Sequence, residues 1–180
     1  MNIYARINNS ILFNLIALTK PRVNFLIIFT AIVGMLLAQD FNLNYSLMVY
    51  ASIGIYLAAS AAAVINHIVD QKIDAIMDRT KGRPLIKGNV TSSHAIYFSV
   101  FISSISTYIL FEYVNTITTI LTLFSIIVYS IIYSVYLKNL TSQNIVIGGI
   151  AGAMPPLLGW TAITNGCLLY TSDAADETGR

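Results

Sequence analysis

Charged residues are scarce in this sequence. Asp, Glu, Lys and Arg make up 10% of its 180 residues, whereas soluble domains carry about 25%. Apolar residues account for 56% and the mean hydropathy is +0.72. A soluble fold of this length cannot bury so much apolar surface. The composition therefore indicates an all-α membrane protein that crosses the lipid bilayer several times.

Cysteine and excess positive charge are also nearly absent. The single cysteine, Cys167, excludes an intramolecular disulfide. The formal net charge is only +2, and the basic residues flank apolar segments or alternate with acids, so no nucleic-acid partner is expected. The first apolar run is long enough to span a membrane and lacks a small-residue cleavage site, which argues against a cleavable signal peptide.

Five apolar segments approach the roughly 20 residues that a membrane helix requires. They cover residues 23–39, 45–65, 94–111, 117–137 and 144–163. Two contain small residues that favour close helix packing, namely the Ala/Ser run 58–63 and Gly148-x-x-x-Gly152. Pro155 and Pro156 are expected to kink or break the fifth helix, because neither has a backbone N–H.

Basic residues are confined to alternate connections between these segments. The connections 40–44 and 112–116 contain neither Lys nor Arg. The bases before Cys167 are Arg6, Lys20, Arg22, Lys72, Arg79, Lys81, Arg83, Lys87 and Lys138. All of them fall on one side of the membrane if the five segments span it, so the N terminus and the connection 66–93 should be cytoplasmic.

The connection after the second segment carries a row of oxygen-bearing side chains. Asn66, Asp70 and Asp74 follow one another at intervals of four residues, and Asp78 extends the row. On a helix the first three lie within roughly 80° of one face. Carboxylates at this spacing repel one another, but Mg²⁺ reverses the effect by bridging one or two carboxylates to substrate phosphates.

Basic residues follow this row directly, and Arg79, Lys81, Arg83 and Lys87 could bind an anion. Acids that hold Mg²⁺ beside bases that hold phosphate predict a diphosphate site. At the end of a membrane helix, the ligand is expected to be a lipid-tailed diphosphate, which reacts by losing diphosphate. A loop whose acids merely balance its bases is the simpler alternative.

The spacing Asn66-x-x-x-Asp70-x-x-x-Asp74, followed by Arg79-Thr80 and Arg83-Pro84, resembles the first aspartate-rich motif of the UbiA-type intramembrane prenyltransferases. Further similarity lies in Thr19-Lys20-Pro21-Arg22-Val23, in Tyr133-Ser-Val-Tyr-Leu-Lys138 and in the run from Gly148 to Trp160. The Ala-Gly-Ala-Met-Pro-Pro sequence within that run is similar to the branch of the family that farnesylates protohaem.

The resemblance implies a bundle of about nine transmembrane helices, of which the chain holds about five, and a second aspartate-rich motif beyond them. It implies transfer of a farnesyl group from farnesyl diphosphate to a vinyl group of protohaem IX, giving haem O, with Mg²⁺ as cofactor. It further implies the bacterial cytoplasmic membrane, with possible handover of the product to haem A synthase or to terminal oxidase assembly.

The resemblance also assigns residues. Asn66, Asp70 and Asp74 would bind Mg²⁺ and the diphosphate, the two aspartates being catalytic. Arg79, Arg83 and Lys138 would contact diphosphate oxygens, and Tyr133 would steady the carbocation. Two alternatives remain, an aromatic prenyltransferase acting on a quinone precursor and a transporter whose acids mark an ion path.

Residues 1–166 are interpreted as the N-terminal part of such a membrane domain. Residues 167–180 change character abruptly, with three acids in a polar stretch. They resemble a translated sequencing adapter and are expected to be a non-native tail. On this interpretation the chain is truncated and by itself inactive.

Overall fold

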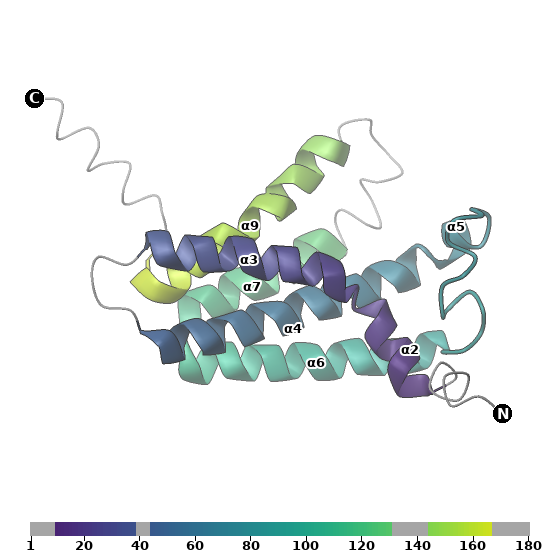
Figure 1. The fold of residues 1–180 in the computed structure, drawn as a ribbon, viewed down its shortest axis with the longest axis horizontal. Coiled ribbons are helices and arrows are strands. Elements are labelled where there is room, and N and C mark those ends of the chain that lie inside the picture. The colour runs from purple at the N-terminus through teal and green to yellow at the C-terminus, as the bar shows by residue number, and fades with distance from the viewer. Residues whose placement is uncertain (1–9, 39–43, 131–143, 167–180) are drawn as a thin grey trace, which may run out of the picture.

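The computed structural model describes residues 10–38, 44–130 and 144–166, and within these ranges the chain is entirely helices and turns (Figure 1). The helices are α2 (Ile11–Leu18), α3 (Pro21–Leu37), α4 (Tyr45–Val69), α5 (Gln71–Asp74), α6 (Ser92–Tyr113), α7 (Thr116–Ile127) and α9 (Asn144–Thr164). The predicted tail lies outside the described residues.

Short polar side chains set where three of the long helices begin. Asn44, Thr91 and Asn115 each accept a hydrogen bond from a backbone N–H in the first turn of α4, α6 and α7. These side chains satisfy backbone donors that have no partner within the helix. The start of α3 instead carries Pro21, whose fixed φ suits the first helical position.

Helices form at all five segments predicted to span the membrane, which confirms a multi-spanning helical bundle. By length and composition α4 and α6 could each cross a membrane alone, and α2 with α3 could form one further span bent by 46°. Helix α2 was not predicted, and the described part of the fourth segment is a shorter apolar helix.

The centre of the bundle is α4, which packs against α3, α6, α7 and α9. Its small residues allow this, since five of the six residues from Ala58 to Ala63 are buried. Further along α4, Ser106 of α6 donates a hydrogen bond of 2.7 Å to the backbone oxygen of Gly54. Close packing against α4 is therefore supported by polar as well as apolar contacts.

The closest helix approach involves different glycines from those predicted. A Cβ atom on Gly34 would lie 2.1 Å from the Pro156 oxygen, and one on Gly159 would lie 2.0 Å from the Ala31 oxygen. Gly152, which was expected to permit close packing, faces open space instead. Helix α9 runs through its two prolines as one assigned helix and changes direction along its length (Figure 1).

One end of the bundle collects the basic residues. The start of α3, the end of α4, the short helix α5 and the start of α6 all lie at this end (Figure 1). Within the described ranges every Lys and Arg belongs to residues 20–22 or 72–87, and Glu112 lies at the far end of α6. This arrangement agrees with the one-sided placement predicted from the sequence.

Candidate active site

The row predicted at the end of α4 is helical as far as Asp74. The backbone N–H of Asp70 donates to Asn66 at 2.9 Å, and that of Asp74 donates to Asp70 at 2.8 Å. Asn66, Asp70 and Asp74 are exposed by only 6%, 6% and 5%. Three oxygen-bearing side chains are thus buried in succession beneath the basic loop, although α4 itself ends at Val69.

Asp78 does not continue this row, contrary to the prediction. The chain turns away after Asp74, because the Thr80 hydroxyl donates to the Asp74 backbone oxygen at 2.7 Å and replaces the next helical turn. Asp78 is instead exposed and forms an ion pair of 2.7 Å with Lys81.

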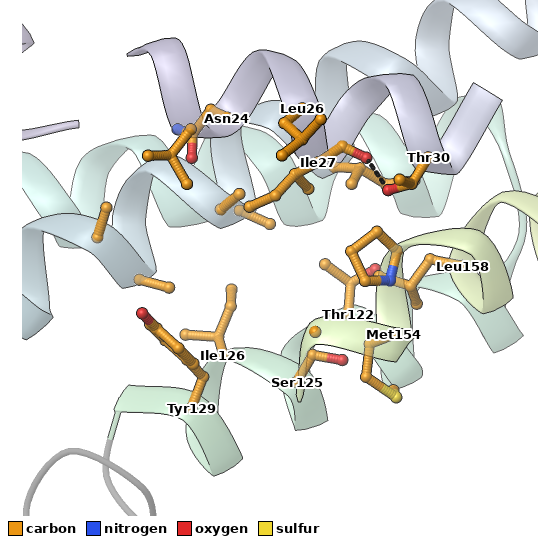
Figure 2. Close-up of a pocket in the computed structure, with 18 of the residues that line it drawn as sticks. Asn24, Leu26, Ile27, Thr30, Thr122, Ser125, Ile126, Tyr129, Met154 and Leu158 are labelled. Atoms are coloured by element: carbon orange, nitrogen blue, oxygen red, sulfur yellow. Dashed lines mark hydrogen bonds between the residues drawn. The ribbon is translucent and has the colours of Figure 1, made fainter. Parts of the chain in front are cut away.

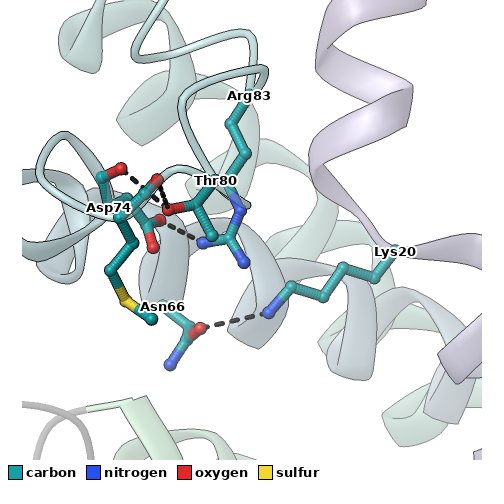
Figure 3. A network of polar contacts seen from close by, with 6 residues as sticks. Lys20, Asn66, Asp74, Thr80 and Arg83 are labelled. Atoms are coloured by element: carbon teal, nitrogen blue, oxygen red, sulfur yellow. Dashed lines mark hydrogen bonds and ion pairs between the residues drawn. The ribbon is translucent and has the colours of Figure 1, made fainter.

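Lys20 reaches the row from the junction between α2 and α3. Its Nζ donates a hydrogen bond of 3.1 Å to Oδ1 of Asn66, 46 residues further along the chain (Figure 3). Its backbone is left-handed, with φ of 53°, a conformation that costs a non-glycine residue free energy and often marks a functional position. Sequence reasoning missed this role, although a base before Pro21 at the start of a span was a visible signal.

Arg83 approaches from the loop after α5 and forms an ion pair with the Asp74 carboxylate (Figure 3). The contact places Arg83 beside the row of Asn66, Asp70 and Asp74 (the acidic row), and its predicted contact with diphosphate stays a prediction. Arg79, which was also predicted to contact diphosphate, is exposed. The predicted residues Tyr133 and Lys138 lie outside the described residues.

The loop that carries Arg83 is anchored to the bundle at both ends. Leu85 and Val90 are 4% and 2% exposed and pack in an apolar cluster with Leu18, Val64 and Ala95. In addition, the Ser92 hydroxyl donates to the Gln71 side chain at 3.0 Å. Such packing restricts where the Arg83 guanidinium can go, which favours a preorganised cation beside Asp74.

Beside Lys20 a cavity of about 390 Å³ extends into the bundle. Its volume falls within the roughly 300–1,000 Å³ typical of ligand pockets. Figure 2 shows Ile27 and Thr30 on one side of it, with Tyr129, Ser125 and Met154 on the other. The remaining lining residues are mostly apolar and come from α3, α4, α7 and α9: Val23, Asn24, Leu26, Ile55, Ala58, Ala59, Ala62, Ala63, Thr122, Ile126, Gly152, Pro155 and Leu158.

The oxygen donors linked to this cavity through Lys20 suit Mg²⁺ shared with a phosphate. Mg²⁺ prefers hard oxygen ligands and is commonly held by one or two carboxylates together with phosphates and water. Asp70, Asp74 and Asn66 offer such oxygens. Among the described residues no three His, Cys, Asp or Glu side chains gather into a metal-binding group. Asn66, Asp70 and Asp74 supply one amide and two carboxylates, which fits a Mg²⁺ ion whose other ligands come from phosphate and water.

These features define a class of protein, a membrane helix bundle in which a buried carboxylate and amide row with cations adjoins an apolar cavity. A family profile described as the UbiA prenyltransferase family matches residues 27–174. The chain belongs to this family.

Curated relatives agree with the profile. The chain is 51% identical over 147 residues to the protoheme IX farnesyltransferase of Hahella chejuensis, covering 82% of this chain and 49% of that protein. It is 50% identical to protoheme IX farnesyltransferase 2 of Pseudoalteromonas atlantica, covering 82% and 48%. The protoheme IX farnesyltransferase of Vesicomyosocius okutanii is 50% identical over 165 residues, covering 87% and 56%.

The chain spans about half the length of the curated relatives it matches. No solved structure matches it significantly.

Proposed function

We propose that the complete protein transfers the farnesyl group of farnesyl diphosphate to a vinyl group of protohaem IX, giving haem O. The observation that carries this proposal is that a charged site is linked to an apolar cavity. Lys20 lines a largely apolar cavity and donates to Asn66, the first member of a buried row whose last member, Asp74, pairs with Arg83. An isoprenoid diphosphate has the same division between a charged head and an apolar tail.

The reaction balances without an oxidant. The bond between the allylic carbon and the diphosphate oxygen breaks, and its electron pair leaves with diphosphate. The vinyl group's terminal carbon then bonds to the allylic carbon, and the positive charge moves to the carbon beside the porphyrin ring. Water adds there and releases a proton. Farnesyl diphosphate, protohaem and water thus give haem O and diphosphate.

Lys20 and Arg83 would stabilise the diphosphate as it leaves. Each presently donates to a member of the acidic row, Lys20 to Asn66 and Arg83 to Asp74. Phosphate oxygens could accept from the same donors, since ammonium and guanidinium groups are strong phosphate ligands. Mg²⁺, held by Asn66, Asp70 and Asp74, would add positive charge that favours departure of the leaving group.

The apolar lining of the cavity would hold the farnesyl tail and keep bulk water from the allylic cation. Water is excluded where few polar groups can bind it, and a site of this kind strengthens electrostatic interactions at its mouth.

We further propose that Tyr133 steadies the cation, that Arg79 and Lys138 contact diphosphate, and that the site opens to the cytoplasmic side of a bacterial inner membrane. Because haem O has a lipid tail, its next acceptor would be another membrane protein, such as haem A synthase or an assembling terminal oxidase.

The test is an assay of the complete protein in detergent or liposomes with farnesyl diphosphate, Mg²⁺ and protohaem. We expect a product whose mass equals that of protohaem plus a farnesyl group and a hydroxyl group, and which disappears when EDTA removes Mg²⁺. A parallel reaction replaces protohaem with a hydroxybenzoate. Prenylation of the hydroxybenzoate but not of protohaem would contradict the acceptor, while retaining a prenyltransferase.

A further inference from the structure

The cavity has a measurable depth along the bundle axis. On α4 its lining runs from Ala63, near the mouth, to Ile55. Eight residues of helix correspond to about 12 Å. On α3 the lining runs from Lys20 to Thr30, which corresponds to about 15 Å. Two of the helices that line the cavity therefore give a similar depth.

The deep end of the cavity is closed by packed side chains. Ile55 and Leu158 line it, yet they are only 2% and 4% exposed. Both also belong to an apolar cluster that continues beyond the cavity with Ala31, Met35, Ala51 and Ala162. Ile55 and Leu158 are thus the last residues of the cavity and the first of the core beneath it.

The two helices beneath this point leave no room for a longer ligand between them. The backbone of α9 touches that of α3 at Gly159 and Ala31, and again at Gly34 and Pro156. At these contacts even a single added carbon would clash with a carbonyl oxygen. An isoprenoid tail descending along α3 cannot pass between α3 and α9 without separating them.

The depth corresponds to one length of isoprenoid. An extended chain advances roughly 1.2 Å per bond, so a farnesyl tail spans about 13 Å. A geranyl tail would span about 8 Å, and a geranylgeranyl tail about 18 Å. A farnesyl tail matches the depth estimated along α4 and α3, whereas a geranylgeranyl tail exceeds it by about one isoprene unit.

We propose that Ile55 and Leu158 form the floor of the isoprenoid site and restrict its substrate to a C15 diphosphate. This inference rests on the proposed prenyl transfer and names the residues that select the length of its donor. With the head group held at Lys20 and the acidic row, a longer tail that continued along the bundle axis would have to displace the two floor side chains. Close packing makes that displacement unfavourable.

The first test enlarges the cavity with Ile55→Ala and Leu158→Ala in the complete protein. Farnesyl and geranylgeranyl diphosphate compete in one reaction, and the ratio of their products is measured. We expect the wild type to prefer farnesyl, and the variants to shift the ratio at least about tenfold toward geranylgeranyl. The matched control is Ile53→Ala, because Ile53 lies on the same helix but is 44% exposed and should not alter the ratio.

The second test shortens the cavity and does not depend on the stability of the enlarged variants. Ala59 lines the cavity one helical turn below Ala63, so Ala59→Phe should favour geranyl over farnesyl diphosphate. The contrary result is that folded Ile55→Ala, Leu158→Ala and Ala59→Phe proteins transfer farnesyl with an unchanged length preference. That result would contradict the assignment of Ile55 and Leu158 as the floor while leaving the proposed function intact. Failure of the wild type to transfer any of the three prenyl groups would overturn the proposed function and, with it, the floor.

Discussion

Lys20 and Arg83 approach the acidic row from two elements far apart in the sequence. Lys20 reaches Asn66 from the start of α3, and Arg83 reaches Asp74 from the loop after α5. Buried carboxylates are costly unless charges or hydrogen bonds compensate them. Arg83 offsets part of this cost by pairing with Asp74, and both Arg83 and Lys20 could bind a diphosphate, so stability and ligand binding draw on overlapping contacts.

We predict that Lys20→Met weakens binding of farnesyl diphosphate in the complete protein. A hydrogen bond to a charged group contributes about 1.5–3 kcal/mol, which corresponds to a loss of affinity of roughly 10- to 150-fold. The measurement is titration of the substrate by calorimetry in detergent. Lys72→Met is the matched control, since Lys72 is an exposed lysine of α5 at the same end of the bundle. Equal losses in both variants would point to a general charge effect rather than to a contact of Lys20.

We predict that Asp70→Ala lowers turnover by at least about 100-fold, the loss typical when one stabilising group is removed from the reacting centre. Its carboxylate is the middle member of the proposed Mg²⁺ row. Haem O formation by the complete protein gives the rate, and circular dichroism reports whether the helices persist.

Asp78→Ala is the control for this prediction, because Asp78 is exposed and pairs only with Lys81 among the described contacts. It should retain wild-type turnover. If Asp70→Ala formed haem O at the wild-type rate, the assignment of Asp70 to the metal would be wrong.

At the scale of whole helices, α3 and α9 are held together through backbone contact. Gly34 and Gly159 leave space for a facing carbonyl oxygen, where any other residue would place a side chain. Without a hydrophobic driving force between helices in lipid, such close packing is a principal source of association. The two contacts also lie beside the proposed cavity floor.

We predict that Gly159→Ala destabilises the bundle by about 1–3 kcal/mol, the usual cost of overpacking. Gly152→Ala, in the same helix, should be neutral or stabilising, because its Cβ would enter open space and alanine is the better helix former. Thermal unfolding in one detergent compares the two. Equal midpoints would show that α3 can move away from α9 at little cost.

The helices were largely predictable from the sequence, and their junctions were not. The predicted start of the second span at Tyr45 and of the fifth at Asn144 coincide with α4 and α9, since long apolar runs bounded by polar residues fix such elements locally. The 46° bend between α2 and α3 and the left-handed Lys20 depend on tertiary packing. The spacing of Asn66, Asp70 and Asp74 could be recognised in the sequence. The contact between Lys20 and Asn66 could not, because the two residues are 46 positions apart.

For the molecule as a whole, charge and helix direction together set its orientation in the membrane. Helix α4 has 25 residues and is therefore about 37 Å long, enough to cross the roughly 30 Å hydrocarbon core. Its Asn66 end lies with the basic loop, and its Tyr45 end lies at the opposite end of the bundle (Figure 1). Because Lys and Arg are retained on the cytoplasmic side, the proposed diphosphate site should face the cytoplasm, where a soluble diphosphate donor would be supplied.

We predict that the cysteine introduced by Asn89→Cys reacts with a membrane-impermeant maleimide only after the membrane is opened. Asn89 is exposed in the basic loop, and the other cysteines of the complete protein are replaced beforehand, Cys167 included. Glu112→Cys is the control, because Glu112 is exposed at the opposite end of α6 and should react in intact spheroplasts. Asn89 lies just before α6 and Glu112 lies near the end of α6. If α6 spans the membrane, the two cysteines therefore lie on opposite sides of it and must give opposite labelling results. Labelling of Asn89→Cys in intact spheroplasts, with protection of Glu112→Cys, would invert the topology and place the acidic row on the side where no cytoplasmic diphosphate could reach it.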